Sequence, residues 1–546
     1  MKRKAVAAVL TAVMVASMFT GCGSDNGSSS AKSASAASAA SAANDTVDED
    51  GKVNGIMYQE GLPLVDEGDY TFSIFCDDSS ESGEFIMLDE FKKQTNVDVD
   101  LKIYPYETAT ERLNLDLNSG DYADVIGGWT LSDNAILTYG VNQGVFIPLE
   151  DYFEKYCPNI SAILDLPGVR EKMTAPDGHI YTIPYVCTDT TVGYSPYINT
   201  KWLENVGMSM PTTTDEFEAV LKAFKEQDAN GNGDASDEIP FSTDPINKHI
   251  EAMAGYFGLP MNKLGIAIQN EKVVYGGVSD TYREFLSWFH KLYAEGLVDV
   301  ELYTQDSSTW EGKGNQDLYG VSIAYGSNEF TGIPAAEERG DFDSMPVLNT
   351  DKDGIWLRDT EGFSVYRTQA VITNKAEHPE IICRWFDNAF ALENGIGCNR
   401  GPVGVIVNKE DDGYHAIDTT TLSEEDQEKY SWGNLWPQSL PKYLPVDFEF
   451  VEEHPMYDEK KATEEAYEAN LTKEIIPSYW IDLDKIDTFS DTNTAIKDFF
   501  EQQQAQFVCG ELDIDNDADW QAYVDGMYSL GLEDWVATQG IEEIAK

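Results

Sequence analysis

The sequence predicts an α/β fold that is divided into at least two domains. Between residues 71 and 126 the strand and helix patterns alternate in the order β-α-β-α-β, which is typical of an open sheet covered by helices. About 490 of the 546 residues follow the N-terminal low-complexity region, and this is more chain than one hydrophobic core normally organises. We therefore expect two or more compact bodies, the first of them α/β.

The N-terminus has the pattern of an export signal. Three basic residues, Lys2 to Lys4, precede a mostly apolar stretch from Ala5 to Phe19 that is short for a membrane span. The stretch closes at Phe19-Thr-Gly-Cys22, which resembles a bacterial lipobox. We expect residues 1–21 to be removed and Cys22 to become the lipidated first residue. Cleavage at a nearby site without lipidation is the alternative.

A flexible tether follows Cys22. Residues 22–55 are rich in Ser and Ala and carry almost no large apolar side chain before Ile56, so they bury too little surface to fold. No later stretch is long and apolar enough to span a bilayer. The expected mature protein is a folded body, lipid-anchored at the extracytoplasmic face of the cell membrane.

Composition argues against nucleic acids and anionic lipid surfaces as partners and is compatible with a sugar ligand. The formal net charge is −60, whereas nucleic acids and anionic lipid surfaces require a basic protein surface. Aromatic residues make up 12% of the chain, and aromatic faces are a common means of holding sugar rings. Most of these aromatic residues are nevertheless expected in hydrophobic cores.

The first folded segment supplies the elements of the α/β pattern. Residues 97–103 alternate apolar and polar side chains, as a half-buried strand does. The predicted elements are, in order, a strand over 71–76, a helix with the stripe Phe85, Leu88 and Phe91, a strand over 97–103, a helix over 108–118 and a strand over 123–126.

Ligands of open α/β sheets gather at the carboxyl ends of the strands. This rule places the loop Asp77-Asp78-Ser79-Ser80 and the loop Gly127-Gly128-Trp129 on one rim of the predicted sheet. Trp129 is interpreted either as a ligand platform or as a packed loop residue, with equal weight.

Residues 228–240 form an acidic loop with the composition of a calcium site. Calcium binds six to eight oxygen atoms, and Gly231 and Gly233 permit the tight path that brings such ligands together. Asp234 is expected to contribute its main-chain carbonyl. The candidate ligands are Asp228, Asn230, Asn232, Asp234, Asp237 and Glu238. A polar turn without a metal is the alternative.

The loop is not a standard EF-hand, because its twelfth position is Ile239 and not a bidentate Glu. A helix enters it: Thr213 and Glu216 have capping-box spacing, and an apolar stripe follows over 217–224. The chain leaves the loop in an extended conformation at Ile239-Pro240-Phe241. We therefore expect a structural calcium ion that ties a helix end to a strand.

Six stretches of the sequence form an ordered set of motifs: Asp121–Val125, Tyr194–Gly207, Pro211–Phe217, the acidic loop, Ile372–Gly395 and Phe507–Leu532. Together they extend over nearly the whole mature chain. In this order they resemble the family 1 solute-binding lipoproteins of bacterial ABC sugar importers. The acidic loop is similar to the calcium site of alginate- and oligosaccharide-binding members, with one extra residue before Asp237.

The resemblance implies a two-lobe periplasmic-binding-protein-like fold with a hinge and an interlobe cleft. Such a protein captures a carbohydrate, here an oligosaccharide, and delivers it to the membrane subunits of an ABC permease. It is expected to be a monomer and not an enzyme. The implied organisation is a signal peptide over 1–21, a tether over 22–55, a first lobe over 56–187 and 360–410, and a second lobe over 188–359 and 411–546.

The cleft of a sugar-binding protein needs aromatic faces for C–H surfaces and planar polar groups for hydroxyls. The loop Trp432–Pro437 is the most suggestive, because turn residues separate two indoles. The candidate ligand-binding residues are Trp129, Trp310, Tyr325, Trp356, Arg358, Trp432 and Trp436.

Two other classes of function stay open. An exported carbohydrate-active enzyme would place two carboxylates across a cleft, and 97 Asp and Glu residues allow such a pair. Neither a G-x-S-x-G nor an H-E-x-x-H motif occurs in the sequence. A peptide-binding lipoprotein is the third class.

Overall fold

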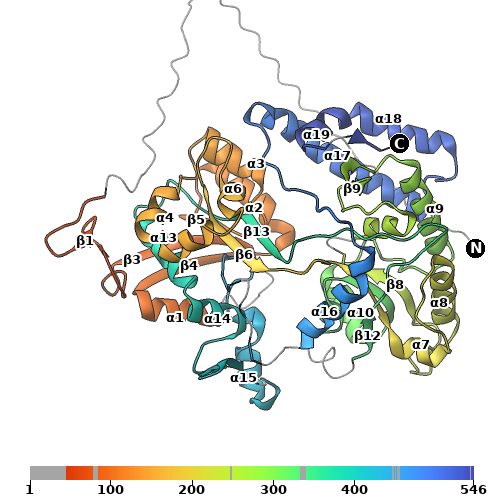
Figure 1. Cartoon of the computed structure of the whole chain (residues 1–546), viewed down its shortest axis with the longest axis horizontal. Coiled ribbons are helices and arrows are strands. Elements are labelled where there is room, and N and C mark those ends of the chain that lie inside the picture. Colours follow the sequence, from red (N-terminus) through yellow and green to blue (C-terminus); the bar gives the residue numbers. More distant parts are fainter. Residues whose placement is uncertain are drawn as a thin grey trace, which may run out of the picture. The chain divides into compact units, whose positions relative to one another are not determined.

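The computed structural model describes most of the chain after the predicted tether (Figure 1). The described residues are 45–77, 84–245, 249–332, 340–417, 419–445, 448, 450–451, 455–541 and 543–545. They belong to one compact unit, Ala39–Lys546. The predicted signal peptide, Cys22 and the rim residues Asp78 to Ser80 lie outside the described residues.

A five-stranded sheet organises the first lobe, in the order β4-β3-β5-β13-β6. The three strands predicted from the sequence run parallel, whereas β13 is antiparallel to both of its neighbours. The strands are β3 (Tyr70–Asp77), β4 (Val97–Tyr104), β5 (Val125–Gly127), β6 (Thr182–Thr188) and β13 (Phe363–Ile372). The predicted β-α-β-α-β order is confirmed, with α1 (Ile86–Thr95) and α2 (Tyr106–Ser119) as its helices.

Both faces of this sheet are buried. Successive side chains of a strand point to opposite faces, and in β3 each of the two faces packs in a core of its own. Ile74 of β3 belongs to the larger core, whereas the next residue, Phe75, packs with Leu113 of α2 on the other face. The helices on the larger core are α1, α4 (Glu150–Tyr156), α5 (Pro158–Leu164), α6 (Val169–Met173), α13 (Pro379–Ala389) and α14 (Leu392–Arg400). Burial on both faces is what an α/β sheet requires.

A four-stranded sheet organises the second lobe, in the order β12-β7-β11-β8. Its strands are β7 (Ser195–Asn199), β8 (Ile239–Thr243), β11 (Tyr319–Ala324) and β12 (Phe342–Ser344). The helices of this lobe are α7 (Thr200–Val206), α8 (Thr214–Glu226), α9 (Asp280–Ala294), α10 (Ser307–Asn315), α11 (Asn328–Thr331) and α16 (Pro455–Tyr467).

The C-terminal helices complete the core of the second lobe. They are α17 (Ile486–Cys509), α18 (Asp517–Ser529) and α19 (Leu532–Thr538), and Figure 1 shows them beside α9. A three-stranded sheet of β9 (Ile266–Gln269), β10 (Lys272–Tyr275) and β16 (Glu543–Ile544) packs in the same core. None of the helices among the described residues has both the length and the apolar character needed to cross a bilayer.

Two segments among the described residues run from one lobe to the other: residues 189–194 join β6 to β7, and residues 357–362 lead back into β13. They are paired, because the Asp189 N–H donates to the Gly362 carbonyl over 3.1 Å. Residues 471–485 run between α16 and α17 of the second lobe, and Trp480 among them packs on the first lobe. Hinges of two-lobed proteins consist of a few such connecting residues.

A smaller region on the first lobe lies between α14 and α16 in sequence. It contains the hairpin β14 (Val407–Glu410) and β15 (Gly413–Ala416), helix α15 (Glu424–Lys429) and the 3-10 turn Trp432–Asn434. Trp436 and Leu440 of this region pack in the core of the first lobe, although the predicted boundary at residue 411 placed them in the second lobe. The reason is that the Trp436 indole stacks on Trp385 of α13, 5.7 Å between ring centroids.

Candidate functional site

The site is built on the rim where strands β3 and β5 end. Asp77, the last residue of β3, is fully buried and accepts backbone N–H bonds from Trp129 and Thr130, at 3.0 and 2.6 Å. Gly128 has a φ of +129°, and a Cβ atom there would lie 2.2 Å from the Asp77 carboxylate. Burial raises the pKa of Asp77. The predicted position of the Trp129 loop on the rim is confirmed, and its side chain is 47% exposed.

Trp129 belongs to a cluster of three aromatic rings, which we call the aromatic cluster: Trp129, Tyr185 and Tyr366. The Trp129 ring lies edge-on to Tyr366, at 5.3 Å between centroids, and 6.4 Å from Tyr185. Tyr185 and Tyr366 stack on each other at 5.4 Å. They come from the paired strands β6 and β13, whose register shifts after Tyr366. The cluster offers half-exposed aromatic surface at one end of the sheet.

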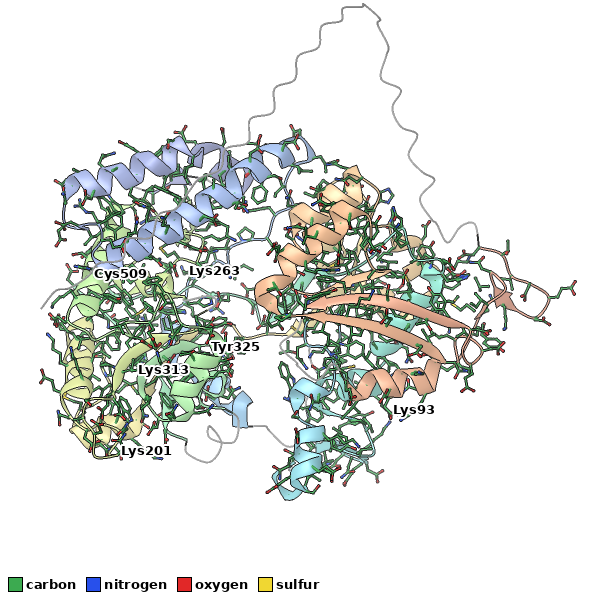
Figure 2. The ribbon with its side chains drawn as sticks, turned by 180° about the vertical axis from the view of Figure 1, so that it is seen from behind. Lys93, Lys201, Lys263, Lys313, Tyr325 and Cys509 are labelled. Atoms are coloured by element: carbon green, nitrogen blue, oxygen red, sulfur yellow. The ribbon has the colours of Figure 1, made fainter. Side chains whose placement is uncertain are left out.

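Asp189 of the first connecting segment links this cluster to the second lobe. Its carboxylate accepts hydrogen bonds from the Ser364 and Tyr366 hydroxyls, at 2.6 and 3.0 Å. Its other oxygen accepts a hydrogen bond from the Tyr325 hydroxyl, over 3.4 Å. Tyr325 follows β11 of the second lobe, and Figure 2 shows it between the two lobes. One carboxylate therefore touches tyrosines of both lobes.

Lys460 of α16 lies against the same tyrosine. Its Nζ atom is 3.7 Å from the centroid of the Tyr325 ring and donates a 2.7 Å hydrogen bond to the Gly193 carbonyl. The side chain is buried, and burial lowers the pKa of Lys460 to about 8. Glu329, whose Oε2 accepts the Tyr325 N–H, has its pKa raised by burial to about 7.

Trp432 is a second exposed indole on the first lobe. It is 50% exposed, and the buried Lys442 places its Nζ 5.1 Å from the centre of the indole. The loop behind it is anchored, since the Met87 N–H at the start of α1 donates to the Leu435 carbonyl and the Ser439 hydroxyl donates to the Asp77 carbonyl. Asp77 thus supports both exposed indoles, one directly and one through this loop.

Three of the predicted ligand residues are instead core residues. Trp310 is 4% exposed and donates from its indole nitrogen to the Ser322 hydroxyl. Trp356 is 2% exposed and packs edge-on against Tyr467. Trp436 is fully buried against Trp385. Each indole fills a core, which leaves no face for a ligand.

Arg358 lies on the second connecting segment, where it binds protein groups. Its Nε donates to the Thr472 carbonyl at 3.2 Å, and its guanidinium is 3.5 Å from Glu468. Of the seven predicted residues, Trp129 and Tyr325 are therefore the two brought together around Asp189, with Trp432 on the same rim. Sequence reasoning missed Tyr185, Tyr366, Asp189 and Lys460, because none of them belongs to a motif and only the fold unites them.

The acidic loop closes in the way its glycines predict. Gly231 and Gly233 have φ values of +75° and +94°. The amide groups of Asn230 and Asn232 donate to the two oxygens of Asp237, at 3.4 and 2.8 Å. Helix α8, which enters the loop, is capped by the Thr213 hydroxyl, which accepts the Glu216 N–H. The Glu216 carboxylate accepts hydrogen bonds from the backbone N–H and the hydroxyl of Thr212. The chain leaves through β8, so the predicted helix-to-strand connection is confirmed.

The donor set of this loop fits a hard cation. Asp228 and Glu238 each use one carboxylate oxygen to accept a backbone N–H, from Gly233 and Ala229. Their other oxygens, Oδ1 and Oε2, are buried and have no hydrogen-bond partner among the described residues. Burial, with Asp237 nearby, raises the pKa of Glu238. Buried carboxylate oxygens without donors are expected where a metal ion supplies the missing charge.

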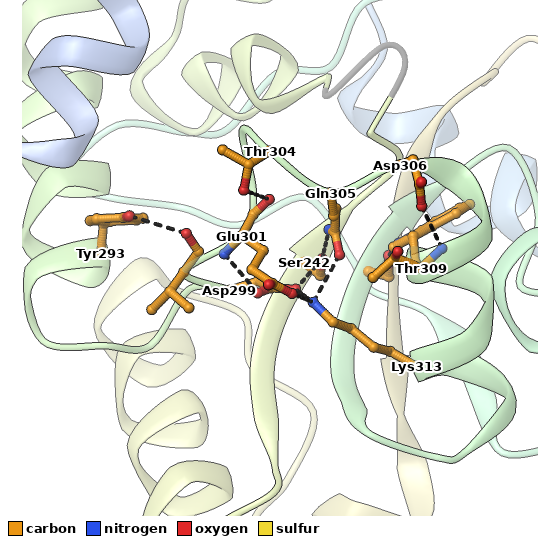
Figure 3. Close-up of polar contacts among 12 residues, drawn as sticks. Ser242, Tyr293, Asp299, Glu301, Thr304, Gln305, Asp306, Thr309 and Lys313 are labelled. Atoms are coloured by element: carbon orange, nitrogen blue, oxygen red, sulfur yellow. Dashed lines mark hydrogen bonds and ion pairs between the residues drawn. The ribbon is translucent and has the colours of Figure 1, made fainter. Parts of the chain in front are cut away.

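A separate polar cluster lies within the second lobe (Figure 3). Lys313 of α10 contacts Asp299 and Glu301, each at 2.8 Å, and donates to the Gln305 side chain at 2.9 Å. The Gln305 amide donates in turn to the Ser242 hydroxyl of β8. The hydrogen-bonding groups and charges of these side chains are paired with one another, which is the arrangement of a structural network.

Comparison with known proteins points to one family. The family model for bacterial extracellular solute-binding protein matches residues 78–395. The fructooligosaccharide ABC transporter substrate-binding protein FusA of Streptococcus pneumoniae serotype 4 is 31% identical over 411 residues, 73% of this chain and 70% of that protein. Lipoprotein LipO of Bacillus subtilis is 28% identical over 280 residues, 50% of this chain and 52% of that protein.

Solved structures agree with this result. S. pneumoniae FusA in complex with kestose aligns with a TM-score of 0.75 at 26% identity, covering 86% of this chain and 98% of that chain. Its EF-hand mutant with fructo-nystose also gives 0.75, at 27% identity and the same coverage. The alginate-binding protein AlgQ2 without calcium ion gives 0.70 at 22% identity, covering 88% and 99%, which indicates a shared fold.

Proposed function

This chain belongs to the bacterial extracellular solute-binding proteins, and from that premise we propose that it captures an oligosaccharide and delivers it to the membrane permease of an ABC transporter. The observation that carries the proposal is Asp189, which touches Tyr366 of the first lobe and Tyr325 of the second. A ligand bound there contacts both lobes and the segment that joins them.

The chemistry of these residues suits a sugar. The C–H faces of pyranose or furanose rings pack on aromatic rings, and Trp129 presents such a face. The hydroxyl groups of a sugar donate to carboxylates and accept from tyrosine hydroxyls, and Asp189 and Tyr325 provide both. Closure of the lobes about the connecting segments then removes the ligand from water. No covalent bond needs to form or break.

The first ligand to test is a fructooligosaccharide, because FusA, the relative with 31% identity, is named for this substrate. Isothermal titration with kestose, nystose, other plant oligosaccharides and short peptides would identify the class, with chromatography of the ligand afterwards. We expect saturable binding of an oligosaccharide that is recovered intact. Accumulation of shorter sugars would establish the enzyme alternative, and binding of peptides alone would establish the third class.

Removal of the Trp129 indole is expected to weaken binding of the identified sugar strongly. A buried aromatic contact of this kind contributes about 2 kcal/mol, so Trp129→Ala should raise Kd roughly 30-fold with little change in melting temperature. Tyr528→Ala is the control, because Tyr528 of α18 is 42% exposed and lies outside the aromatic cluster. Equal affinity of the wild type and Trp129→Ala would remove the aromatic cluster from the site.

We also propose that the acidic loop binds a structural calcium ion. Asp228, Asn230, Asn232, Asp237 and Glu238 would hold it through side chains, and Asp234 through its carbonyl. The ion supplies positive charge to the two buried oxygens without donors, and it would join the end of α8 to the start of β8.

Calcium is therefore expected to raise the melting temperature, and chelation to lower it. At free calcium of about 100 times Kd the stabilisation is about 2.7 kcal/mol. Asp228→Asn should abolish the calcium-dependent shift, which differential scanning calorimetry measures. Asp234→Asn keeps the main-chain carbonyl and should retain the shift. A melting curve that is the same in chelator and in calcium would contradict the site.

The remaining organisation follows from the sequence. We infer that residues 1–21 direct export, that Cys22 carries the lipid, and that residues 23–44 form the tether to the membrane. The predicted tether extended to residue 55, but residues 45–55 belong to the first lobe. Val53 is buried in its core, Asp45 accepts a hydrogen bond from the Tyr156 hydroxyl, and Asn54 donates one to Glu380. Mass spectrometry of the mature N-terminus tests this assignment. We change the predicted lobe boundaries in two places. The first lobe begins at residue 45, and the region around Trp436 moves to the first lobe because its side chains pack there.

A further inference from the structure

Lys460 has hydrogen-bonding capacity that the protein does not use. An ammonium group carries three N–H donors. Within the described residues its Nζ atom donates one hydrogen bond, to the Gly193 carbonyl, and otherwise lies over two aromatic rings, Tyr325 at 3.7 Å and Tyr197 at 6.0 Å from the centroids. The side chain is only 7% exposed, so bulk water gives it little compensation. A buried charge with free donors is costly unless a further partner is supplied.

The carboxylates around Lys460 favour its charged form, against the larger opposing effect of burial, and do not pair with it. Four carboxylates act on Lys460 through space: Glu329, Glu459, Asp189 and Asp359. All four are already engaged elsewhere. Glu329 accepts the Tyr325 N–H, and Glu459 accepts the Ser327 N–H and hydroxyl. Asp189 accepts the Ser364 and Tyr366 hydroxyls, and Asp359 accepts the Gly193 N–H. In the described part of the chain none of the four forms an ion pair with Lys460, whose contacts are the Gly193 carbonyl and the two tyrosine rings. The ammonium is held in place, with donors to spare.

The position of these donors is close to the site proposed above. Lys460 lies on Tyr325, the Tyr325 hydroxyl reaches Asp189, and Asp189 binds Tyr366 of the aromatic cluster. Its one hydrogen bond holds Gly193, which lies on the first connecting segment. A sugar resting between the aromatic cluster and Tyr325 would therefore meet an ammonium group from α16.

We propose that Lys460 contacts the ligand directly, and that its ammonium donates two hydrogen bonds to hydroxyl or ring oxygens of the bound oligosaccharide. The inference rests on the proposed function and adds a residue to its site. Ligand binding then requires the protonated side chain. The same ammonium group donates a hydrogen bond to the Gly193 carbonyl, so Lys460 would connect the bound ligand to the first connecting segment.

The requirement for a proton gives the proposal a pH signature. The titratable groups around Lys460 come from the connecting segments, β6, β7, β13, the segment after β11 and α16. They are Asp189, Asp359, Tyr185, Cys187, Tyr197, Tyr366, Tyr325, Glu329 and Glu459. Burial raises the pKa of Cys187 to about 12 and raises those of the four tyrosines, while Glu329 titrates near 7.

Among these groups Lys460, with its pKa of about 8, is therefore the one that loses its proton as the pH rises above 7.5. The ligand binds the protonated form, so affinity should be constant below this pKa and should fall as the pH rises through it. Between pH 7 and pH 9.5 we expect the Kd of the wild type for kestose to increase about 30-fold, as the protonated fraction falls.

The test is titration calorimetry with kestose, or with the sugar that the screen identifies, on the wild type and Lys460→Met. Methionine keeps the length of the stem and removes the donors. We expect the variant to bind at least tenfold more weakly at pH 7, with a Kd that no longer changes up to pH 9.5. Lys460→Arg should recover part of the affinity at pH 7 and should bind without the decline near pH 8.

Lys461→Met is the matched control, because Lys461 is the next residue of the same helix and is exposed. It removes the same charge and should keep the affinity and pH profile of the wild type. A wild-type Kd that stays constant from pH 7 to pH 9.5 would overturn the inference even if Lys460→Met did not fold. A folded Lys460→Met that matches the wild type would overturn it too. Failure of the wild type to bind any oligosaccharide would instead reject the proposed function itself.

Discussion

Replacing Trp436 by alanine is expected to lower the free energy of unfolding by about 3–5 kcal/mol, the largest effect predicted for this protein. The indole is fully buried, stacks on Trp385 at 5.7 Å and lies 5.2 Å from Phe91. Truncation removes these contacts and leaves a cavity between α1, α13 and the loop that supports Trp432. Urea unfolding, followed by fluorescence and by circular dichroism, measures the change.

Trp432→Ala is the matched control, since it makes the same truncation four residues away. Trp432 is 50% exposed, so the stability of this variant should change by less than about 1 kcal/mol. If the two variants were equally stable, the assignment of Trp436 to the core would be wrong. Weaker sugar binding by Trp432→Ala alone would add Trp432 to the ligand site.

Removing Lys313 is expected to destabilise the second lobe by about 3 kcal/mol. Lys313→Met leaves the Asp299 carboxylate, which is 3% exposed, without its ion-pair partner at 2.8 Å (Figure 3). A buried carboxylate that loses its partner carries the full penalty of desolvation, which is larger than the net value of the intact pair. The same unfolding experiment measures the loss.

The control for Lys313 is an exposed ion pair of the same kind. Lys92 contacts Asp98 at 2.6 Å, but the two side chains are 55% and 48% exposed. Water screens such a pair, so Lys92→Met should change stability by less than about 1 kcal/mol. If Lys313→Met and Lys92→Met lowered the free energy of unfolding equally, burial of Asp299 would not be the cause of the destabilisation.

Local patterns predicted the elements that depend on neighbouring residues. The alternation over 97–103 and the stripe of α8 correspond to an observed strand and helix, because periodicity reports directly which face of an element is buried. The capping residue Thr213 and the glycines of the acidic loop also behave as predicted, since caps and turns are made within a few residues. The position of Trp129 followed from a rule about strand ends.

The identity of the core tryptophans could not be predicted in this way. Trp432 and Trp436 occupy one loop with similar neighbours in the sequence, yet one is half exposed and the other is buried. The difference arises because Trp436 meets Trp385 and Phe91, which lie 51 and 345 residues away along the chain. Burial by distant partners leaves no trace in the local pattern.

The amino-acid sequence by itself determined the order of strands and helices in the first lobe and the path of the acidic loop, and export and tethering stay predictions from it. These depend on periodicity, turn chemistry and composition, each of which acts over a few residues. Only the tertiary structure decided which residues meet around Asp189, where Tyr366 and Tyr325 come from different lobes and Lys460 from a helix far along the chain. A binding site between lobes depends on where the chain passes from one lobe to the other. Those passages are determined by packing over the whole molecule and not by the residues next to them in the sequence.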